Sequence, residues 1–194
     1  MARIFDEFLR GSIGKKIPLS RMMLHKIPGG DAGTKKTLEK MAEIVAKSMR
    51  HPEHAAYIRN ITLQVIVKDA CAPRNYLCEY EAIHEFVRDK IRWTRDARGF
   101  EVLTWPARTL MVGAGDCDCK STLEATMLLM IGFPKVAFRA IGANPEMPDQ
   151  YTHVYIIAKP DRKSPWIPSD PTVPNAKLGW ESPLILKKLD HEIQ

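Results

Sequence analysis

Apolar residues in the first half of the chain recur at steps of three and four, the spacing of one helix face. In KKTLEKMAEIVAKSMR they form a single stripe, which we interpret as a packing face, and Thr34 is expected to cap this helix at its start. HPEHAAYIRNITLQVIVKDA predicts a second helix with Pro52 in its first turn. EYEAIHEFVRDKIRW predicts a third, on which His84 is expected to be a surface or packing residue. The first stripe consists of Leu38, Met41, Ile44, Val45 and Met49.

The pattern changes after Cys117. CDCKSTLEATMLLMIG predicts a helix with Leu123, Met127 and Met130 on its buried side and Gly132 at its end. KVAFRAIGA and THVYIIAKP alternate as strands do, and the proline-punctuated PWIPSDPT suits an edge strand. Helices followed by strands predict an α+β fold, in which the helix that begins at Cys117 packs against an antiparallel sheet.

Charge divides the chain unevenly. Of the net charge of +6, all lies in residues 1–60, which hold 12 Lys and Arg against 6 Asp and Glu, whereas residues 61–194 hold 17 of each. We therefore expect a basic, mainly helical N-terminal region over 1–70, used for docking or packing, and a second domain over 71–194. A basic segment can bind nucleic acid or an acidic protein surface. No interleaved aromatic pattern or nucleic-acid-binding motif accompanies it, so nucleic acid is not an expected partner.

The overall composition, 45% hydrophobic and 27% charged, is that of an ordinary globular protein. No apolar run is long enough to span a bilayer, and the N-terminal MARIFDEFLRGSIGKK has charges threaded through its apolar residues, unlike a secretory signal. These features predict a protein without a membrane span that is cytoplasmic as synthesised. The final KLGWESPLILKKLDHEIQ does not indicate whether it docks on the rest of the chain.

The four cysteines, Cys71, Cys78, Cys117 and Cys119, are too few and too clustered for a disulfide-stapled scaffold. The pair Cys117 and Cys119 could begin a metal site together with His153, but a second matching cysteine pair is lacking. We expect neither a metal nor another cofactor, and a metal-dependent site ranks last among the functional hypotheses.

Three residues carry a candidate chemistry: Cys117 at a helix start, His153 early in a strand, and Asp170 in the next extended segment. A helix N-terminus and a neighbouring imidazolium both favour the thiolate, which is the reactive form of cysteine. A carboxylate behind the imidazole would fix its tautomer and orientation. The backbone N–H of Cys117 could donate to the oxyanion that forms on attack.

GAGDCDCKSTLEATMLLMIGFP, THVYIIA and WIPSDPT together resemble the three motifs of the transglutaminase-like superfamily of papain-like cysteine enzymes. IRWTRD resembles the extended segment ahead of that family's Gly-Asp-Cys motif, and the match spans residues 80–182. The likeness is greatest to the compact bacterial and phage members, which often end in a Gly-Trp like Gly179–Trp180. It implies a catalytic triad with Cys117 as nucleophile, His153 as general base and acid, and Asp170 as the orienting group.

One departure is Cys119, where the compact members carry a second acid; on a helix this position points away from the nucleophile. Trp105 and Asp116 are candidates for the oxyanion hole or a pocket wall, and a core position is an equally good interpretation of Trp105. The resemblance implies a cysteine peptidase or amidase that acts on a protein or peptide through a thioester. An amine in place of water would give a transglutaminase-like acyltransferase, and no residue decides between the two.

The alternative is a structural or assembly protein that keeps this fold and docks through its basic N-terminal region. By analogy with phage members of the superfamily, it would be a virion or tail component, with a virion-associated location. The triad residues favour the enzyme.

Overall fold

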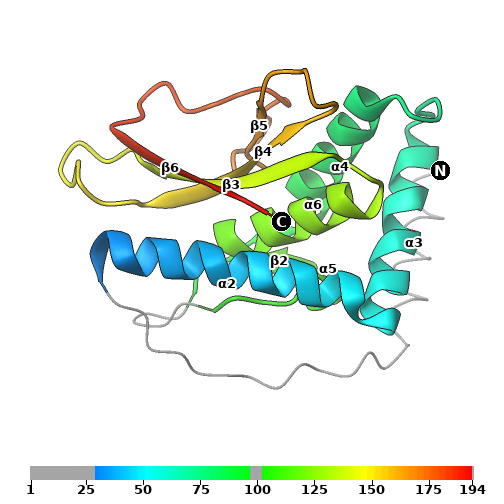
Figure 1. Ribbon diagram of the computed structural model, residues 1–194, viewed down its shortest axis with the longest axis horizontal. Coiled ribbons are helices and arrows are strands. Elements are labelled where there is room, and N and C mark those ends of the chain that lie inside the picture. Colours follow the sequence, from blue (N-terminus) through cyan, green and yellow to red (C-terminus); the bar gives the residue numbers. More distant parts are fainter. Residues whose placement is uncertain (1–28, 97–101, 194) are drawn as a thin grey trace.

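The computed structural model describes residues 29–96 and 102–193 as a layered arrangement of helices and one main sheet (Figure 1). The helices are α2 (Gly30–Arg50), α3 (Pro52–Lys68), α4 (Tyr76–Lys90), α5 (Pro106–Val112) and α6 (Cys117–Met130). The strands of the main sheet are β3 (Lys135–Gly142), β4 (His153–Lys159), β5 (Ile167–Ser169) and β6 (Lys187–Glu192). A separate pair consists of β1 (Arg92–Trp93) and β2 (Ala114–Gly115).

The main sheet is antiparallel, with the strand order β5-β4-β3-β6. Residue Ile141 of β3 lies opposite His153 at the start of β4, and β5 pairs with the second half of β4. The mixed helix–sheet architecture confirms the α+β class, and the position of β5 confirms the edge strand expected from its prolines. The last strand, β6, takes the other edge.

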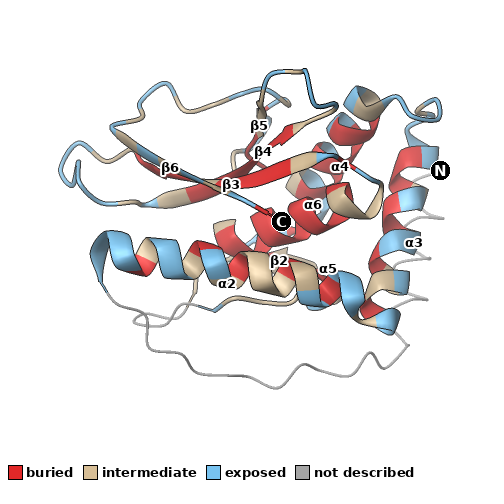
Figure 2. Ribbon diagram, in the orientation of Figure 1, coloured by how far each residue is buried: buried red, intermediate tan, exposed pale blue. Residues whose placement is uncertain are grey.

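Helix α6 is the centre of the molecule, in contact with each of the other four helices and with β3 and β4. Figure 2 shows it buried along its length, whereas α2 and α3 expose their outer faces. One hydrophobic cluster joins α6 to the helices of the N-terminal region, through Leu123 and Met127 on one side and Met41, Val45 and Ile61 on the other. The described helices before residue 70 therefore pack on the core.

The N-terminal region begins differently from the sequence expectation. Helix α2 starts at Gly30 with Gly29 in the N-cap position, so the prediction that Thr34 caps it is wrong. The loop residues IPGGDAGT are thus partly helical, because α2 extends one turn further than its apolar stripe. Residues 1–28, which hold much of the basic charge, lie outside the described residues. No described helix combines the length and apolar character needed to cross a membrane.

A disulfide joins Cys71, in the connection between α3 and α4, to Cys78 in the first turn of α4, with their Cα atoms 5.7 Å apart. The argument against a disulfide-stapled scaffold did not anticipate this single bridge. Disulfides persist mainly in oxidising compartments, so the bridge weighs against a cytoplasmic location.

Replacing Cys71 and Cys78 together by serine should lower the free energy of unfolding by about 2.5 kcal/mol, because the bridge closes a short loop and restricts the unfolded chain. Urea unfolding of the variant, with and without dithiothreitol, measures this difference. Dithiothreitol should destabilise the parent and leave the double variant unchanged. Equal stability of parent and variant would contradict the bridge.

Candidate functional site

The Gly-Asp-Cys motif is held by a short strand pair that leads directly into α6. β1 and β2 run parallel, with Trp93 opposite Gly115, which bears out the extended segment expected ahead of the motif. A Cβ at Gly115 would lie 2.6 Å from the Cβ of Cys119, so no other residue fits there without a shift. Asp116 then caps the helix, because its Oδ1 accepts the backbone N–H of Cys119 at 3.0 Å. The structure thus gives Asp116 a role at the helix start.

Cys117, the first residue of α6, lies against the beginning of β4. Its partly buried thiol donates to Oδ1 of Asp118 at 3.7 Å, and the backbone N–H of Val154, the residue after His153, is near enough to lower the pKa of the thiol. One turn further along α6, the hydroxyl of Ser121 donates to the carbonyl of Val154 at 3.2 Å. The first turn of α6 is therefore fixed next to His153. No hydrogen bond joins the Cys117 sulfur to the His153 ring among the described contacts.

His153 and Asp170 are in direct contact. Nε2 of His153 lies 2.7 Å from Oδ2 of Asp170, whose other oxygen accepts the hydroxyl and the backbone N–H of Thr172 at 2.5 and 3.0 Å. Asp170 is only 3% exposed. Burial raises the pKa of its carboxyl, but the bonds from His153 and Thr172 outweigh burial and hold the pKa below its usual value. Because Nε2 faces the carboxylate, Nδ1 is the ring nitrogen left for proton exchange.

The Cys117 thiol is protonated in this arrangement. Burial raises its pKa well above the usual value, and the carboxylates of Asp118 and Asp116 raise it further, against the weaker effect of the hydrogen bond from Val154. Burial, together with the carboxylates of Asp118 and the N-cap Asp116, thus outweighs the helix N-terminus, which alone would favour the thiolate.

Alkylation of Cys117 by iodoacetamide should therefore keep accelerating from pH 7 to pH 10 without a plateau, because only the thiolate reacts. Peptide mass mapping after timed quenching gives the rate at each pH. Cys119, whose pKa is raised to about 12 by burial and Asp116, provides an internal comparison. A plateau below about pH 8.5, the ordinary thiol value, would contradict the protonated resting state.

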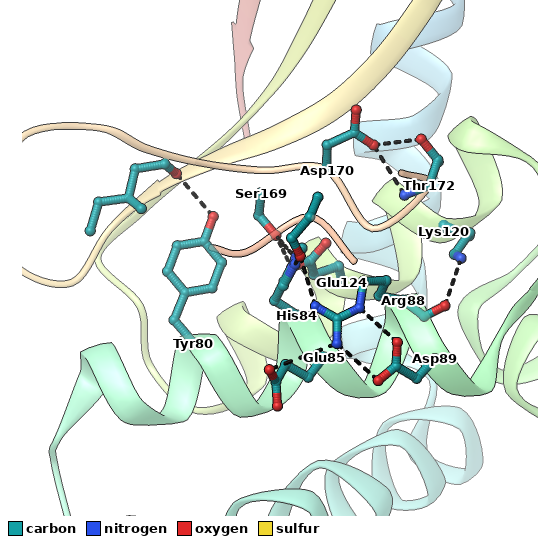
Figure 3. A network of polar contacts seen from close by, with 12 residues as sticks. Tyr80, His84, Glu85, Arg88, Asp89, Lys120, Glu124, Ser169, Asp170 and Thr172 are labelled. Carbon is teal, nitrogen blue, oxygen red and sulfur yellow. Dashed lines mark hydrogen bonds and ion pairs between the residues drawn. The ribbon is translucent and has the colours of Figure 1, made fainter. Parts of the chain in front are cut away.

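A buried polar network lies directly beneath Asp170 (Figure 3). The ring of His84 places Nδ1 2.7 Å from the hydroxyl of Ser169 and Nε2 2.9 Å from the carbonyl of Ala176, and Ser169 is also bonded to the carboxyl of Glu124. His84 and Glu124 are fully buried. His84 is thus a packing residue, as expected. It also bonds Ser169 and Ala176, which lie at the two ends of the segment that contains Asp170.

The protons of this network can be assigned by counting donors. Nε2 of His84 must donate to Ala176, since a carbonyl only accepts. If Glu124 is protonated, it donates to Ser169, and Ser169 donates to Nδ1 of His84, so every bond has one proton. Burial favours this neutral form: it raises the pKa of Glu124 to about 8 and lowers the pKa of His84. We therefore assign a proton to Glu124 at neutral pH.

Helix α4 holds β5 and the turn after it with three side chains at four-residue spacing. The hydroxyl of Tyr80 donates to the carbonyl of Ile167 at 3.0 Å, His84 bonds as above, and Arg88 donates to the carbonyl of Ala176 at 2.7 Å. Residues four apart share one helix face. The sequence carries this signal as polar residues at Tyr80, His84 and Arg88, between the apolar positions of the same helix.

The other predicted residues lie elsewhere. Trp105 precedes α5, and its described ring contacts are with His54 and His51 of the α2–α3 corner, at centroid distances of 5.0 and 6.4 Å. Cys119 is buried on another side of α6, where its sulfur approaches the carbonyl of Val102 at 3.4 Å. Within residues 29–96 and 102–193, no group of three or more His, Cys, Asp or Glu side chains is placed to hold a metal ion.

Comparison with known proteins gives little guidance. No protein-family model matches the chain, and no curated protein matches it. Among solved structures, the chain is similar to Legionella pneumophila LapG at 15% identity and a TM-score of 0.47, over 70% of this chain and 73% of LapG. A likeness at this level carries no argument about mechanism.

Proposed function

We propose that the chain is a cysteine-dependent hydrolase of peptide or isopeptide-like amides, acting through a thioester on Cys117. The observation that supports this most is the hydrogen bond of 2.7 Å between His153 and Asp170. His153 directly precedes Val154, whose backbone N–H acts on the Cys117 thiol. Cys117 begins α6, His153 begins β4 and Asp170 directly follows β5, which is the arrangement that the proposal uses.

The reaction begins with the substrate carbonyl next to the sulfur of Cys117. As the sulfur attacks, its proton passes to Nδ1 of His153, because the resting thiol is protonated and no preformed ion pair is available. This transfer requires the sulfur and Nδ1 to come within hydrogen-bond distance when substrate binds, as catalytic contacts commonly do. Asp170 stabilises the resulting imidazolium through Nε2.

The tetrahedral intermediate then collapses to a thioester. His153 returns its proton to the leaving amine as the C–N bond breaks. The same ring then takes a proton from the water that attacks the thioester, and passes it to the sulfur of Cys117 as the C–S bond breaks and the acid is released. The backbone N–H of Cys117, at the open end of α6, is the proposed oxyanion donor. Hydrolysis is favoured over cross-linking because water needs no second binding site.

The direct test is digestion of a proteome-derived peptide library, read by mass spectrometry, with the parent protein and with Cys117→Ala. We expect new termini with the parent and none with the variant, and the parent should show an acyl-enzyme mass on rapid quenching. The matched control Cys119→Ala should cleave as the parent does. Equal cleavage by Cys117→Ala would overturn the proposal, and no cleavage or acylation by the parent would favour the structural or assembly role.

A further inference from the structure

A groove beside the candidate site has no part in the chemistry described so far. Its volume is about 360 Å³, within the range of about 300–1,000 Å³ usual for ligand sites. One wall is the end of α4 and β1, the other is the turn that follows Asp170, and Lys120 of α6 lies between them. It is lined by Arg88, Asp89, Lys90, Ile91, Arg92, Trp93, Lys120, Pro171, Thr172, Pro174 and Asn175.

The groove is electropositive. Its one acid, Asp89, is neutralised within the wall, because Nε and Nη2 of Arg88 bond its two oxygens at 2.6 and 2.9 Å (Figure 3). Three further cations remain, and none of them forms an ion pair with an acid among residues 29–96 and 102–193. These three are Lys90, Arg92 and Lys120.

Lys120 is the unusual member, because it is buried and forms no direct ion pair within the described part of the chain. Its residue is 2% exposed, and its ammonium, which has three donors, makes one described hydrogen bond, to the carbonyl of Arg88 at 3.3 Å. Burial lowers its pKa to about 8. The carboxyls of Glu124, Asp170 and Asp89 act against this lowering from a distance, but none of them forms an ion pair with Lys120 among residues 29–96 and 102–193. A buried ammonium in this state gains most from an anion that enters the groove.

Three residues of the groove lining lie close to the candidate site, either by direct contact or along the chain. Thr172 in its wall bonds Asp170 and lies 3.3 Å from Nε2 of His153. Trp93 is paired with Gly115, two residues before Cys117, and Lys120 follows Cys117 by one turn. A peptide bound at the Cys117 sulfur would therefore have one of its own side chains within reach of the groove.

We propose that this groove binds an acidic residue of the peptide substrate, with its carboxylate at Lys120 and Arg92 and its methylene stem along Trp93. The inference rests on the proposed function and names its substrate class. Trp93 is 51% exposed and offers an apolar face for the stem. A carboxylate accepts charge-assisted hydrogen bonds from both cations, which a neutral amide of the same shape accepts less strongly.

The test measures binding apart from catalysis, in the full chain with Cys117→Ala. Two blocked pentapeptides, acetyl-Ala-Ala-Glu-Ala-Ala-amide and its Gln counterpart, are titrated and followed by NMR. We expect the Glu peptide to bind on the order of tenfold tighter, the effect of about one charge-assisted hydrogen bond. Adding Lys120→Met should reduce the preference to about twofold or less.

Lys163→Met is the matched control, because Lys163 is exposed in the turn at the far end of the β4–β5 hairpin from His153. It should keep the full preference. If Lys120→Met cannot be purified, Arg92→Gln replaces it as the test variant. Arg92 is exposed, so this change does not endanger folding, and it should lower the preference for the Glu peptide.

Equal binding of the two peptides, or no binding of either, would overturn the inference. Tighter, Lys120-dependent binding of hexathymidylate would overturn it in favour of nucleic acid. A Glu preference in Cys117→Ala, combined with no cleavage by the parent protein, would leave the groove assignment standing while the proposed function fails.

Discussion

His153→Ala should reduce kcat/KM for a cleaved peptide by at least about 10³-fold, because it removes the ring that we propose takes the thiol proton. The loss should be larger than for many cysteine hydrolases, since the thiol of Cys117 has a raised pKa and cannot ionise in advance. Steady-state kinetics on a peptide from the library digest measures it, after circular dichroism has shown that the variant is folded.

The matched control is His191→Ala. His191 lies on β6 opposite Phe138, away from the start of β4, so its removal should change kcat/KM by less than about twofold. Asp170→Ala should give an intermediate loss with a changed pH profile, because the imidazolium loses its partner while the base remains. Activity of His153→Ala within tenfold of the parent would contradict the assignment of the base.

Glu124→Ala should lower the free energy of unfolding by about 3 kcal/mol, because it opens a cavity in α6 and leaves Ser169 without its partner. Glu124→Gln should cost less than about 1 kcal/mol, since the amide can donate to Ser169 as the protonated carboxyl does. Urea unfolding at pH 6.5 compares the two. If Gln proves as harmful as Ala, the proton assignment is wrong.

The same proton predicts how stability depends on pH. The folded state holds it up to about pH 8, whereas the unfolded state releases it near 4.5, so stability falls as pH rises through this interval. The pKa of His84 is lowered in the folded state, so His84 makes stability rise with pH, but only below its unfolded pKa of 6.5. Between pH 6.5 and 8 the parent should therefore lose about 2 kcal/mol that Glu124→Gln does not lose. Above about pH 8, Lys120 begins to restore stability, because its folded pKa lies below 10.5.

Much of the fold could be predicted because its signals are local. The steps of three and four in α2, the alternation in β3 and β4, and the prolines of β5 each reflect the immediate surroundings of the side chains in one element. The start of α6 at Cys117 was predicted from the glycine-rich turn before it, whereas Asp116 was expected at the oxyanion hole or a pocket wall and not as the helix cap. That cap is the Asp116 bond to the N–H of Cys119.

The remaining features depend on contacts between distant parts of the chain. β6 has the sequence KKLDHE, whose many charged residues do not predict a strand. It forms because the edge of β3 is available for pairing. Charged residues of this kind are usual on edge strands. Thr34 was a good cap by type, but the chain continues α2 upstream of it. The roles of His84 and Glu124 became visible only when α4, α6 and β5 were placed together.

The hydrogen bonds from α4 to β5 and to the turn after it have a consequence for how the protein folds. The bonds of Tyr80 and His84 join residues 85 to 92 positions apart, so a long loop must close before Asp170 is held in place. Closing such a loop costs entropy that local helix formation does not, and contacts of this kind slow folding. During refolding, helical content should return before the candidate site is assembled. Recovery of activity would then report completion of the whole fold.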